Sequence, residues 1–271
     1  MSSGWTGDLN LASVSSSAGV SSLSVKARLL FSGGNDPQGL SVARAMIAQN
    51  HLIGTAGWSV DRSLADFPRE GSALERYAAV FSAVEVNSSF YRRHRPATWQ
   101  RWHDAVPDGF GFSVKLPRRI THERALADAS DELKVFFDDV APLRRKLAGL
   151  LIQLPPKLAF DREVAVGFFA TLSEVSPVPA FLEPRHASWA APDVSVLLQD
   201  HGVGRVYADP QDSALQAAAE ASGACYLRLH GRPRSTIRPM SRMRSRATPP
   251  CWRRRSGRFG AFSTILPRAP R

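Results

Sequence analysis

The chain has 271 residues, 44% of them hydrophobic, which suffices for one full-sized core and fits a single α/β barrel of about 250 residues better than two small domains. No apolar run approaches the roughly 20 residues of a transmembrane helix, and the N-terminus lacks the basic start and apolar stretch of a secretory signal. The two cysteines, Cys225 and Cys251, show no metal-ligand spacing. These features argue against a membrane protein and a disulfide scaffold, and we expect a cytoplasmic location without a membrane partner.

The net charge of +11 comes almost entirely from the C-terminal end of the chain. Residues 51–234 contain 22 Lys and Arg and 22 Asp and Glu, whereas residues 235–271 contain 10 arginines and no acidic residue. Binding of nucleic acid through its phosphates requires positive charge on the folded domain itself. The overall charge therefore does not support nucleic acid as a partner, although a locally basic site could still bind it.

Residues 1–50 are rich in Ser and Gly, and we expect a disordered or mis-started N-terminal extension there. From residue 51 onward, short apolar segments alternate with helical patterns, two of which begin after the N-cap residues Asp161 and Asp212. The predicted strands are residues 51–55, 83–87, 110–116, 149–154, 180–183, 204–208 and 224–230. The predicted helices are residues 73–81, 96–105, 131–147, 161–174, 191–199 and 212–221. This alternation predicts an α/β fold, a TIM-type (β/α) barrel over residues 51–234 without a proper eighth strand.

A polar or charged cluster follows each predicted strand. The most distinctive clusters are Glu-Val-Asn-Ser-Ser-Phe-Tyr-Arg at 85–92, Lys-Leu-Pro-Arg-Arg-Ile-Thr-His at 115–122 and Glu-Pro-Arg-His at 183–186. They are accompanied by Gly-Thr-Ala-Gly-Trp-Ser at 54–59, Gln-Leu-Pro-Pro at 153–156, Ser-Trp at 188–189 and Leu-His-Gly at 229–231. In this order the clusters resemble those of the YecE-like family of TIM-barrel proteins, also called domain of unknown function 72 (DUF72). The resemblance implies the barrel fold and leaves the activity open, because the family has no settled reaction.

Residues 235–271 depart from this family pattern. The last strand of the family reads approximately Trp-Cys-Ile-Phe-Asp-Asn-Thr-Ala, whereas here the segment is arginine-rich without a strand or helix period. If the third base of each codon is joined to the first two bases of the next, residues 259–268 can encode Trp-Cys-Ile-Phe-Asp-Asn-Thr-Ala-Pro-Gly, and residues 235–241 can encode Tyr-Tyr-Ser-x-Tyr-Glu. We therefore hypothesise a frameshift near Arg234. The alternative is a genuine basic tail, and sequencing of the DNA across codons 225–271 decides between them.

Active sites of TIM barrels lie where the carboxyl ends of the parallel strands meet, so side chains in and just after the strand ends are the candidate site residues. Acids, amines and imidazoles at this position can transfer protons or act as nucleophiles. The catalytic candidates are Glu85, Lys115, Glu183, His186 and His230. Arginines are suited to two-pronged binding of phosphate or carboxylate groups. The substrate-binding candidates are Asn87, Tyr91, Arg118, Arg119, His122, Arg185, Asp209 and Arg228.

The carboxylates leave three interpretations open. Carboxylate and imidazole ligands suit Zn, Mn or Mg, and the candidate ligands of a divalent metal are Glu85, Glu183, Asp209 and His230. Alternatively, the glutamates pair with Arg185, Arg228 or Lys115 and hold the mouth of the barrel together, or one carboxylate acts as a general base without a metal. Lys115 is either an electrostatic anchor or an amine that forms a Schiff base. The cofactor thus stays open, with a divalent metal as the one candidate.

The candidate residues favour an enzyme, a hydrolase or lyase that acts on a phosphate-bearing or other anionic substrate at the mouth of the barrel. A metal-dependent phosphodiesterase acting on nucleic acid is a special case that rests on fold analogy alone. Two alternatives stay open. One is a non-catalytic binding module for an anionic metabolite or nucleic acid, and the other is a defective, frameshifted product without activity.

Overall fold

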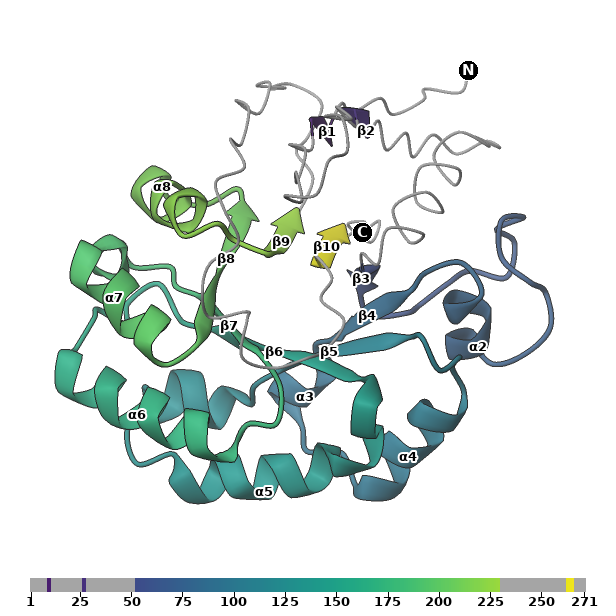
Figure 1. Ribbon diagram of the computed structural model, residues 1–271. Helices are drawn as coiled ribbons and strands as arrows, with labels where there is room; N and C mark the ends of the chain where they lie inside the picture. Colours follow the sequence, from purple (N-terminus) through teal and green to yellow (C-terminus); the bar gives the residue numbers. More distant parts are fainter. Residues whose placement is uncertain (1–8, 11–25, 28–51, 230–261, 266–271) are drawn as a thin grey trace, which may run out of the picture.

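The computed structural model describes residues 9–10, 26–27, 52–229 and 262–265. The predicted (β/α) barrel is confirmed: seven parallel strands follow one another in chain order around a curved sheet, and helices cover its outer face (Figure 1). These strands are β3 (Ile53–Ala56), β4 (Ala83–Val86), β5 (Gly111–Lys115), β6 (Leu147–Gln153), β7 (Ala180–Glu183), β8 (Val203–Asp209) and β9 (Tyr226–Leu229). A separate antiparallel pair consists of β1 (Leu9–Asn10) and β2 (Lys26–Ala27).

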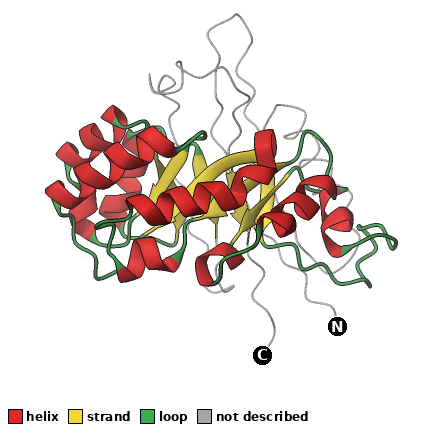
Figure 2. Ribbon diagram, turned by 90° about the horizontal axis from the view of Figure 1, so that it is seen from below, coloured by secondary structure: helices red, strands yellow, loops and turns green. Residues whose placement is uncertain are grey.

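The helices lie on the outer side of the sheet, as the view turned by 90° also shows (Figure 2). The longer ones are α2 (Ala73–Ala78), α4 (Pro96–Asp104), α5 (Ser130–Val140), α6 (Arg162–Val175), α7 (Pro192–Asp200) and α8 (Ser213–Ala221). Short segments follow three of the strands or lead into β6: α3 (Ser88–Tyr91), the π-helix η1 (Arg119–Glu123), and the 3-10 helices η2 (Ala141–Lys146) and η3 (Ala187–Ala190). None of the helices within the described ranges is long and apolar enough to cross a membrane.

Local sequence signals account for most helix boundaries. The Asp161 carboxylate accepts a hydrogen bond from the Val164 N–H at 3.1 Å, and Asp212 caps α8 in the same way, as predicted. The predicted helix 131–147 is too long, because α5 ends at Val140. Pro142 cannot continue a regular α-helix, and Arg144 has a φ of 49°, so the chain passes through η2 and enters β6 two residues earlier than expected.

The eighth position of the barrel is occupied by β10 (Phe262–Ile265). This short strand is parallel to both neighbours, in register with four residues of β9 but with only two residues of β3. It falls inside the segment 259–268, for which the sequence predicts no strand in its own reading frame. Backbone hydrogen bonds of a sheet are independent of side-chain type, so a segment without a strand pattern can still pair. The eighth position is therefore filled by a short segment rather than by a regular continuation of the β/α alternation.

The two faces of the sheet bury different kinds of side chain. The outer face contributes residues such as Val84, Phe112 and Ile152 to one large core shared with the helices. The inner face carries a small apolar cluster at its lower, amino-terminal part, in which the Phe181 ring fills the barrel. Gly149 and Gly204 leave room for this ring, since a Cβ at either position would lie about 3 Å from it. Above this layer, the inner face is polar, which places the chemistry at the carboxyl ends of the strands.

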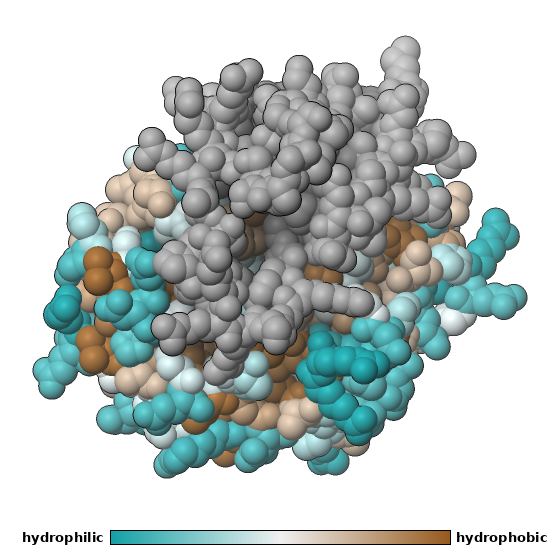
Figure 3. Space-filling view, viewed as in Figure 1, coloured by the Kyte–Doolittle hydropathy of each residue, from teal (hydrophilic) through white to brown (hydrophobic). Residues whose placement is uncertain are grey.

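The outer surface of the helical layer is mainly hydrophilic at its edge, with apolar residues gathered nearer the centre of the view (Figure 3). This distribution is ordinary for a domain whose helices bury one apolar stripe each.

Candidate functional site

Seven polar side chains of the inner face form one continuous hydrogen-bonded chain. They come from five strands, because residues two apart in a strand point to the same face. The members, in the order of their contacts, are Ser113, Tyr226, Glu85, Arg228, Glu183, Gln153 and Lys115. Each of the seven is at most 9% exposed. Buried polar groups are retained only when they are satisfied, and this chain satisfies its members by each other.

Arg228 is the centre of this chain. Its Nε and Nη2 donate to Oε2 and Oε1 of Glu85 at 2.9 and 3.0 Å, a two-pronged contact, and its Nη1 donates to Oε2 of Glu183. The Tyr226 hydroxyl adds a hydrogen bond to Glu85 Oε2 at 2.7 Å and lies 2.9 Å from Ser113 Oγ. A single guanidinium thus pairs with both buried carboxylates. Of the three interpretations of the carboxylates, this geometry matches the ion-pair network.

Burial and neighbouring charges shift the pKa values of three groups in this network. Burial by itself would raise the pKa of Glu183, but Arg228, Gln153 and Arg185 together hold it below its ordinary value. Burial would lower the pKa of Arg228, and the two glutamates raise it instead. Burial and the adjacent Glu85 carboxylate raise the pKa of the Tyr226 hydroxyl. At neutral pH Glu183 is therefore ionised, Arg228 is charged and Tyr226 is a neutral donor.

Lys115 lies at one end of this hydrogen-bonded chain of side chains, and the effects of burial and neighbouring charges on its pKa balance differently. Its Nζ donates to Oε1 of the Gln153 amide at 2.6 Å and lies 4.0 Å from the centre of the Phe90 ring. Burial, and after it the charge of Arg228, lowers the pKa of Lys115 from 10.5 to about 8, and the attraction of the two glutamates only partly opposes this. The contact with the Phe90 ring also favours the ammonium form. Lys115 is therefore a buried amine with a substantial neutral fraction near physiological pH.

Three further basic side chains lie around Lys115. Burial, followed by the charges of Lys115, Arg118 and Arg185, lowers the pKa of His122, which places all four groups within electrostatic reach. Arg185 also contacts Glu183 at 3.4 Å, while 44% of its side chain is exposed. His122 is held by the π-helix η1, its ring packed on Phe90. π-Helical turns are rare and occur frequently at functional sites.

Several predicted site residues do not join this cluster. Arg119 pairs with Glu132 of α5 at 3.1 Å, and the Tyr91 side chain is 78% exposed. His186 caps η3, since its Nδ1 accepts the Ser188 N–H at 3.3 Å. Asp209 is in register with Leu229 rather than with Arg228, so it lies on the outer face of the sheet.

Two more predicted residues stand apart for other reasons. Asn87 follows β4 directly, and its buried Oδ1 has no hydrogen-bond partner among the described residues. His230 lies outside the described residues. The remaining predictions, Glu85, Lys115, Arg118, His122, Glu183, Arg185 and Arg228, are brought together at the mouth.

The carboxylates of the site are poorly suited to hold a metal. Both oxygens of Glu85 and both oxygens of Glu183 accept hydrogen bonds from protein donors. Within the ranges that the structure describes, no group of three His, Cys, Asp or Glu side chains is arranged to bind a metal ion. A metal would have to displace Arg228 from both glutamates.

Sequence reasoning missed four members of the site: Ser113, Gln153, Tyr226 and Phe90. A strand-alternation signal was available for two of them, because Ser113 and Tyr226 precede Lys115 and Arg228 by two positions and so share their face. Gln153 stood in a recognised cluster but was not assigned a role. Nothing in the sequence indicates that Phe90 lies under the lysine amine.

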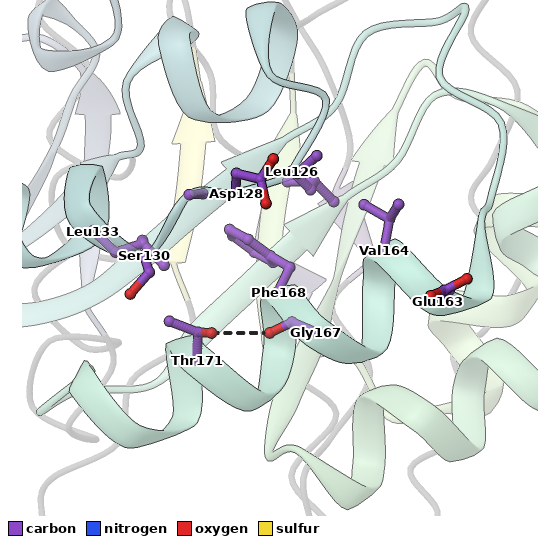
Figure 4. Close-up of a pocket in the computed structure, with 11 residues that line it drawn as sticks. Leu126, Asp128, Ser130, Leu133, Glu163, Val164, Gly167, Phe168 and Thr171 are labelled. Atoms are coloured by element: carbon purple, nitrogen blue, oxygen red, sulfur yellow. Dashed lines mark hydrogen bonds between the residues drawn. The ribbon is translucent and has the colours of Figure 1, made fainter.

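A separate groove, lined by none of these residues, lies between α5 and α6 (Figure 4). Its polar lining consists of Asp128, Ser130, Glu163 and Thr171, and Thr171 Oγ1 donates to the Gly167 carbonyl at 3.0 Å. No Lys or Arg side chain lines it. The groove therefore lacks the groups that an anionic ligand requires.

Comparison with known proteins gives a family match. A family model described as "Protein of unknown function DUF72" matches residues 52–259. The UPF0759 protein YecE of Escherichia coli K12 is 33% identical over 84 residues, 31% of each chain, and YunF of Bacillus subtilis is 29% identical over 148 residues, 52% of each chain. The matched parts thus span about a third and about half of these relatives.

Solved structures of two bacterial proteins share the fold. A DUF72 family protein from Thermotoga maritima has a TM-score of 0.54 at 25% identity and covers 68% of this chain and 75% of its own. A DUF72 family protein from Enterococcus faecalis has a TM-score of 0.56 at 21% identity, with 68% and 72% covered. The similarity to these two structures supports the barrel fold and does not indicate an activity.

Proposed function

The chain belongs to the DUF72 family of proteins of unknown function, and we propose that its barrel mouth binds a small anionic ligand, phosphate-bearing or carboxylate-bearing, as the substrate of a hydrolase or lyase. The observation that carries the proposal is the double pairing of Arg228 with Glu85 and Glu183. Because this single guanidinium binds both carboxylates, little of their negative charge remains for the neighbouring basic groups: Arg185 lies 3.4 Å from Glu183, and Lys115 contacts no carboxylate among the described residues.

The excess of positive charge supports an anion. Two buried carboxylates face three cations, Arg228, Lys115 and Arg185. Arg118 adds a fourth nearby cation, although it also pairs with the exposed Glu123 at 3.7 Å. Cations that converge in a partly dehydrated site interact more strongly with an anion than they do in water. A phosphate or carboxylate group is therefore the chemical group that best complements this mouth.

Calorimetric titration of the full chain with inorganic phosphate tests the proposal. We expect saturable binding that Arg185→Met weakens at least about tenfold, because each charge-assisted hydrogen bond contributes about 1.5–3 kcal/mol. Arg162→Met is the matched control, since Arg162 pairs with Asp193 on the outer helices at 3.3 Å. Absence of phosphate binding, or equal binding by both variants, would overturn the proposal.

A non-catalytic binding module is the second candidate. It is favoured by the full engagement of Glu85 and Glu183, which leaves neither carboxylate free to act as a general base. Turnover of a panel of phosphate esters and carboxylic acids separates the candidates: an enzyme converts one of them, whereas a binding module is stabilised against heat by a ligand that it leaves unchanged. Nucleic acid is a less suitable ligand, because residues 51–234 carry no net charge.

A further inference from the structure

We infer that Lys115 is a carbonyl-reactive amine, which condenses with an aldehyde or ketone group of the anionic ligand to form an imine. This role depends on the anion site proposed above and narrows it: the substrate is an anionic carbonyl compound, and the reaction class is that of a lyase. The contacts of the lysine, the state of its charged neighbours and a second buried lysine in the same chain support the assignment.

The contacts of Lys115 leave its amine available. Among the described residues, the hydrogen-bond acceptor of Nζ is the amide oxygen of Gln153, and no carboxylate lies within 4 Å of it. The face of the Phe90 ring covers one side. A lysine that serves as an ion-pair anchor is normally in contact with a carboxylate. Here the two nearest carboxylates are bound by Arg228 instead.

The charges around Lys115 disfavour its ammonium form. The guanidinium groups of Arg228 and Arg185 repel it, while Arg228 weakens the attraction of Glu85 and Glu183 by pairing with both. A lysine desolvated beside another cation is one of the standard ways in which proteins prepare an amine for Schiff-base chemistry. With a pKa of about 8, about one amine in ten is neutral at pH 7.

Lys146 is equally buried, but its amine has different contacts. Its side chain is 4% exposed, yet Nζ donates to the carbonyl oxygens of His103 and Val106 at 2.8 and 2.7 Å and lies 3.8 Å from Asp108. Lys146 thus has two backbone acceptors and a nearby carboxylate, whereas Lys115 has one acceptor and two cations for neighbours.

The condensation is balanced without a co-reactant. The lone pair of neutral Nζ attacks the carbonyl carbon, the carbonyl oxygen leaves as water with the two amine hydrogens, and a carbon–nitrogen double bond remains. Arg185 and the other basic groups around the lysine would bind the anionic group of the same molecule and so hold its carbonyl near Nζ. Cyanoborohydride delivers a hydride to the imine carbon, and with a proton on nitrogen the product is a stable secondary amine.

Reductive trapping with glyoxylate, a small aldehyde with a carboxylate, tests the inference on the full chain. Peptide mapping by mass spectrometry compares Lys115 with the exposed Lys134 and Lys157. At pH 7 we expect Lys115 to be modified at least about tenfold faster than either, because its lowered pKa leaves about one amine in ten neutral and the adjacent basic groups hold the carboxylate of glyoxylate. Inorganic phosphate should slow modification of Lys115 only. Acetaldehyde, which lacks an anionic group, should keep the part of the preference for Lys115 that comes from its neutral amine and lose the part that comes from the anion site.

Trapping and calorimetry together distinguish a failure of this inference from a failure of the proposed anion site. Modification of Lys134 and Lys157 at rates equal to or above that of Lys115 would overturn the inference, and calorimetry with phosphate on the same preparation would show whether the anion site survives. If phosphate does not bind and Lys115 is not modified, both proposals fail. Lys115→Arg should abolish the fast modification, while Lys157→Arg should retain it. The map of the unaltered chain decides the matter even if Lys115→Arg does not fold.

Discussion

The two ends of the barrel each bury a lysine, and they use it differently. At the amino-terminal end, Lys146 closes η2 onto the C-terminal turn of α4 through two backbone carbonyls. At the carboxyl end, Lys115 terminates β5 with one amide acceptor, an aromatic ring and two neighbouring arginines. The side chains are almost equally buried, at 4% and 7% exposed. The difference lies in hydrogen-bond satisfaction and in the sign of the neighbouring charges.

This contrast shows how the fold separates stability from function. A buried lysine that donates to several acceptors contributes to stability, because removing it leaves those acceptors unsatisfied. A buried amine with few acceptors and like charges nearby costs stability and is retained where chemistry requires it. In a TIM barrel the two roles fall at opposite ends of the strands, the base serving stability and the mouth serving function.

Loss of Arg228 should have the largest effect. Arg228→Met leaves two buried carboxylates without their shared counterion, and the free energy of unfolding should fall by about 3–5 kcal/mol. Urea denaturation measures this change. Arg162→Met, which breaks an exposed ion pair, is the control and should change stability by less than about 1 kcal/mol. A loss below about 1 kcal/mol for Arg228→Met would show that the mouth does not depend on this network.

Replacement of each lysine tests the comparison directly. Lys146→Met should lower the free energy of unfolding by about 2–3 kcal/mol, because the carbonyls of His103 and Val106 lose a charged donor. Lys115→Met should cost less than about 1 kcal/mol, since it removes one hydrogen bond together with an unfavourable buried charge. Both values come from the same denaturation assay. Equal losses would contradict the distinction between the two ends.

The pH dependence of stability should reveal the lowered pKa of Lys115 in the folded protein. Its pKa is 10.5 unfolded and about 8 folded, so the unfolded chain binds more protons between these values. The penalty for the buried charge is present in full below pH 8 and is relieved as the pH rises toward 10.5. From pH 7 to pH 10, the unfolding free energy of the native chain should increase by about 2 kcal/mol relative to Lys115→Met.

The groups that face Lys115 are Glu85, Glu183, Arg185, Arg228 and His122. Arg228 does not titrate in this range because its pKa is raised, and Glu183 and His122, whose pKa values are lowered, have already lost their protons at pH 8. Buried tyrosines contribute equally to both proteins and cancel in the difference. A flat difference between pH 7 and pH 10 would place the folded pKa of Lys115 near its ordinary value and remove the support that it gives to imine formation.

Replacement of Arg119 should have the smallest effect on stability and on phosphate affinity. The sequence places it beside Arg118 in a candidate anion-binding cluster, but it pairs with Glu132 on an exposed helix face. Arg119→Ala should change stability by less than about 1 kcal/mol and leave phosphate affinity within about twofold. The same titration that measures Arg185→Met provides the comparison. A tenfold loss of affinity in Arg119→Ala would extend the anion site beyond the residues around Lys115.

The sequence predicts most of the barrel because its signals are local. Apolar runs such as Leu150-Leu151-Ile152 mark strands buried on both faces, and the caps at Asp161 and Asp212 mark helix starts, without reference to the rest of the chain. The same locality explains the error in the helix predicted over 131–147, where amphipathic spacing continued past Pro142 but the backbone did not. It also explains why β10 was not predicted, since its pairing is made by the backbone.

The strand-end rule likewise identifies Glu85, Lys115, Glu183 and Arg228 as candidates from sequence alone. What the sequence by itself determines is therefore the order of the β/α units and the set of polar residues at their carboxyl ends. Only the tertiary structure decides that Arg228 binds both glutamates, that Tyr226 and Ser113 extend the hydrogen-bonded network of side chains, and that Asp209 faces outward. The physical reason is distance along the chain: Arg228 and Glu85 are 143 residues apart, and their contact depends on how the strands register around a closed barrel, which no local pattern encodes.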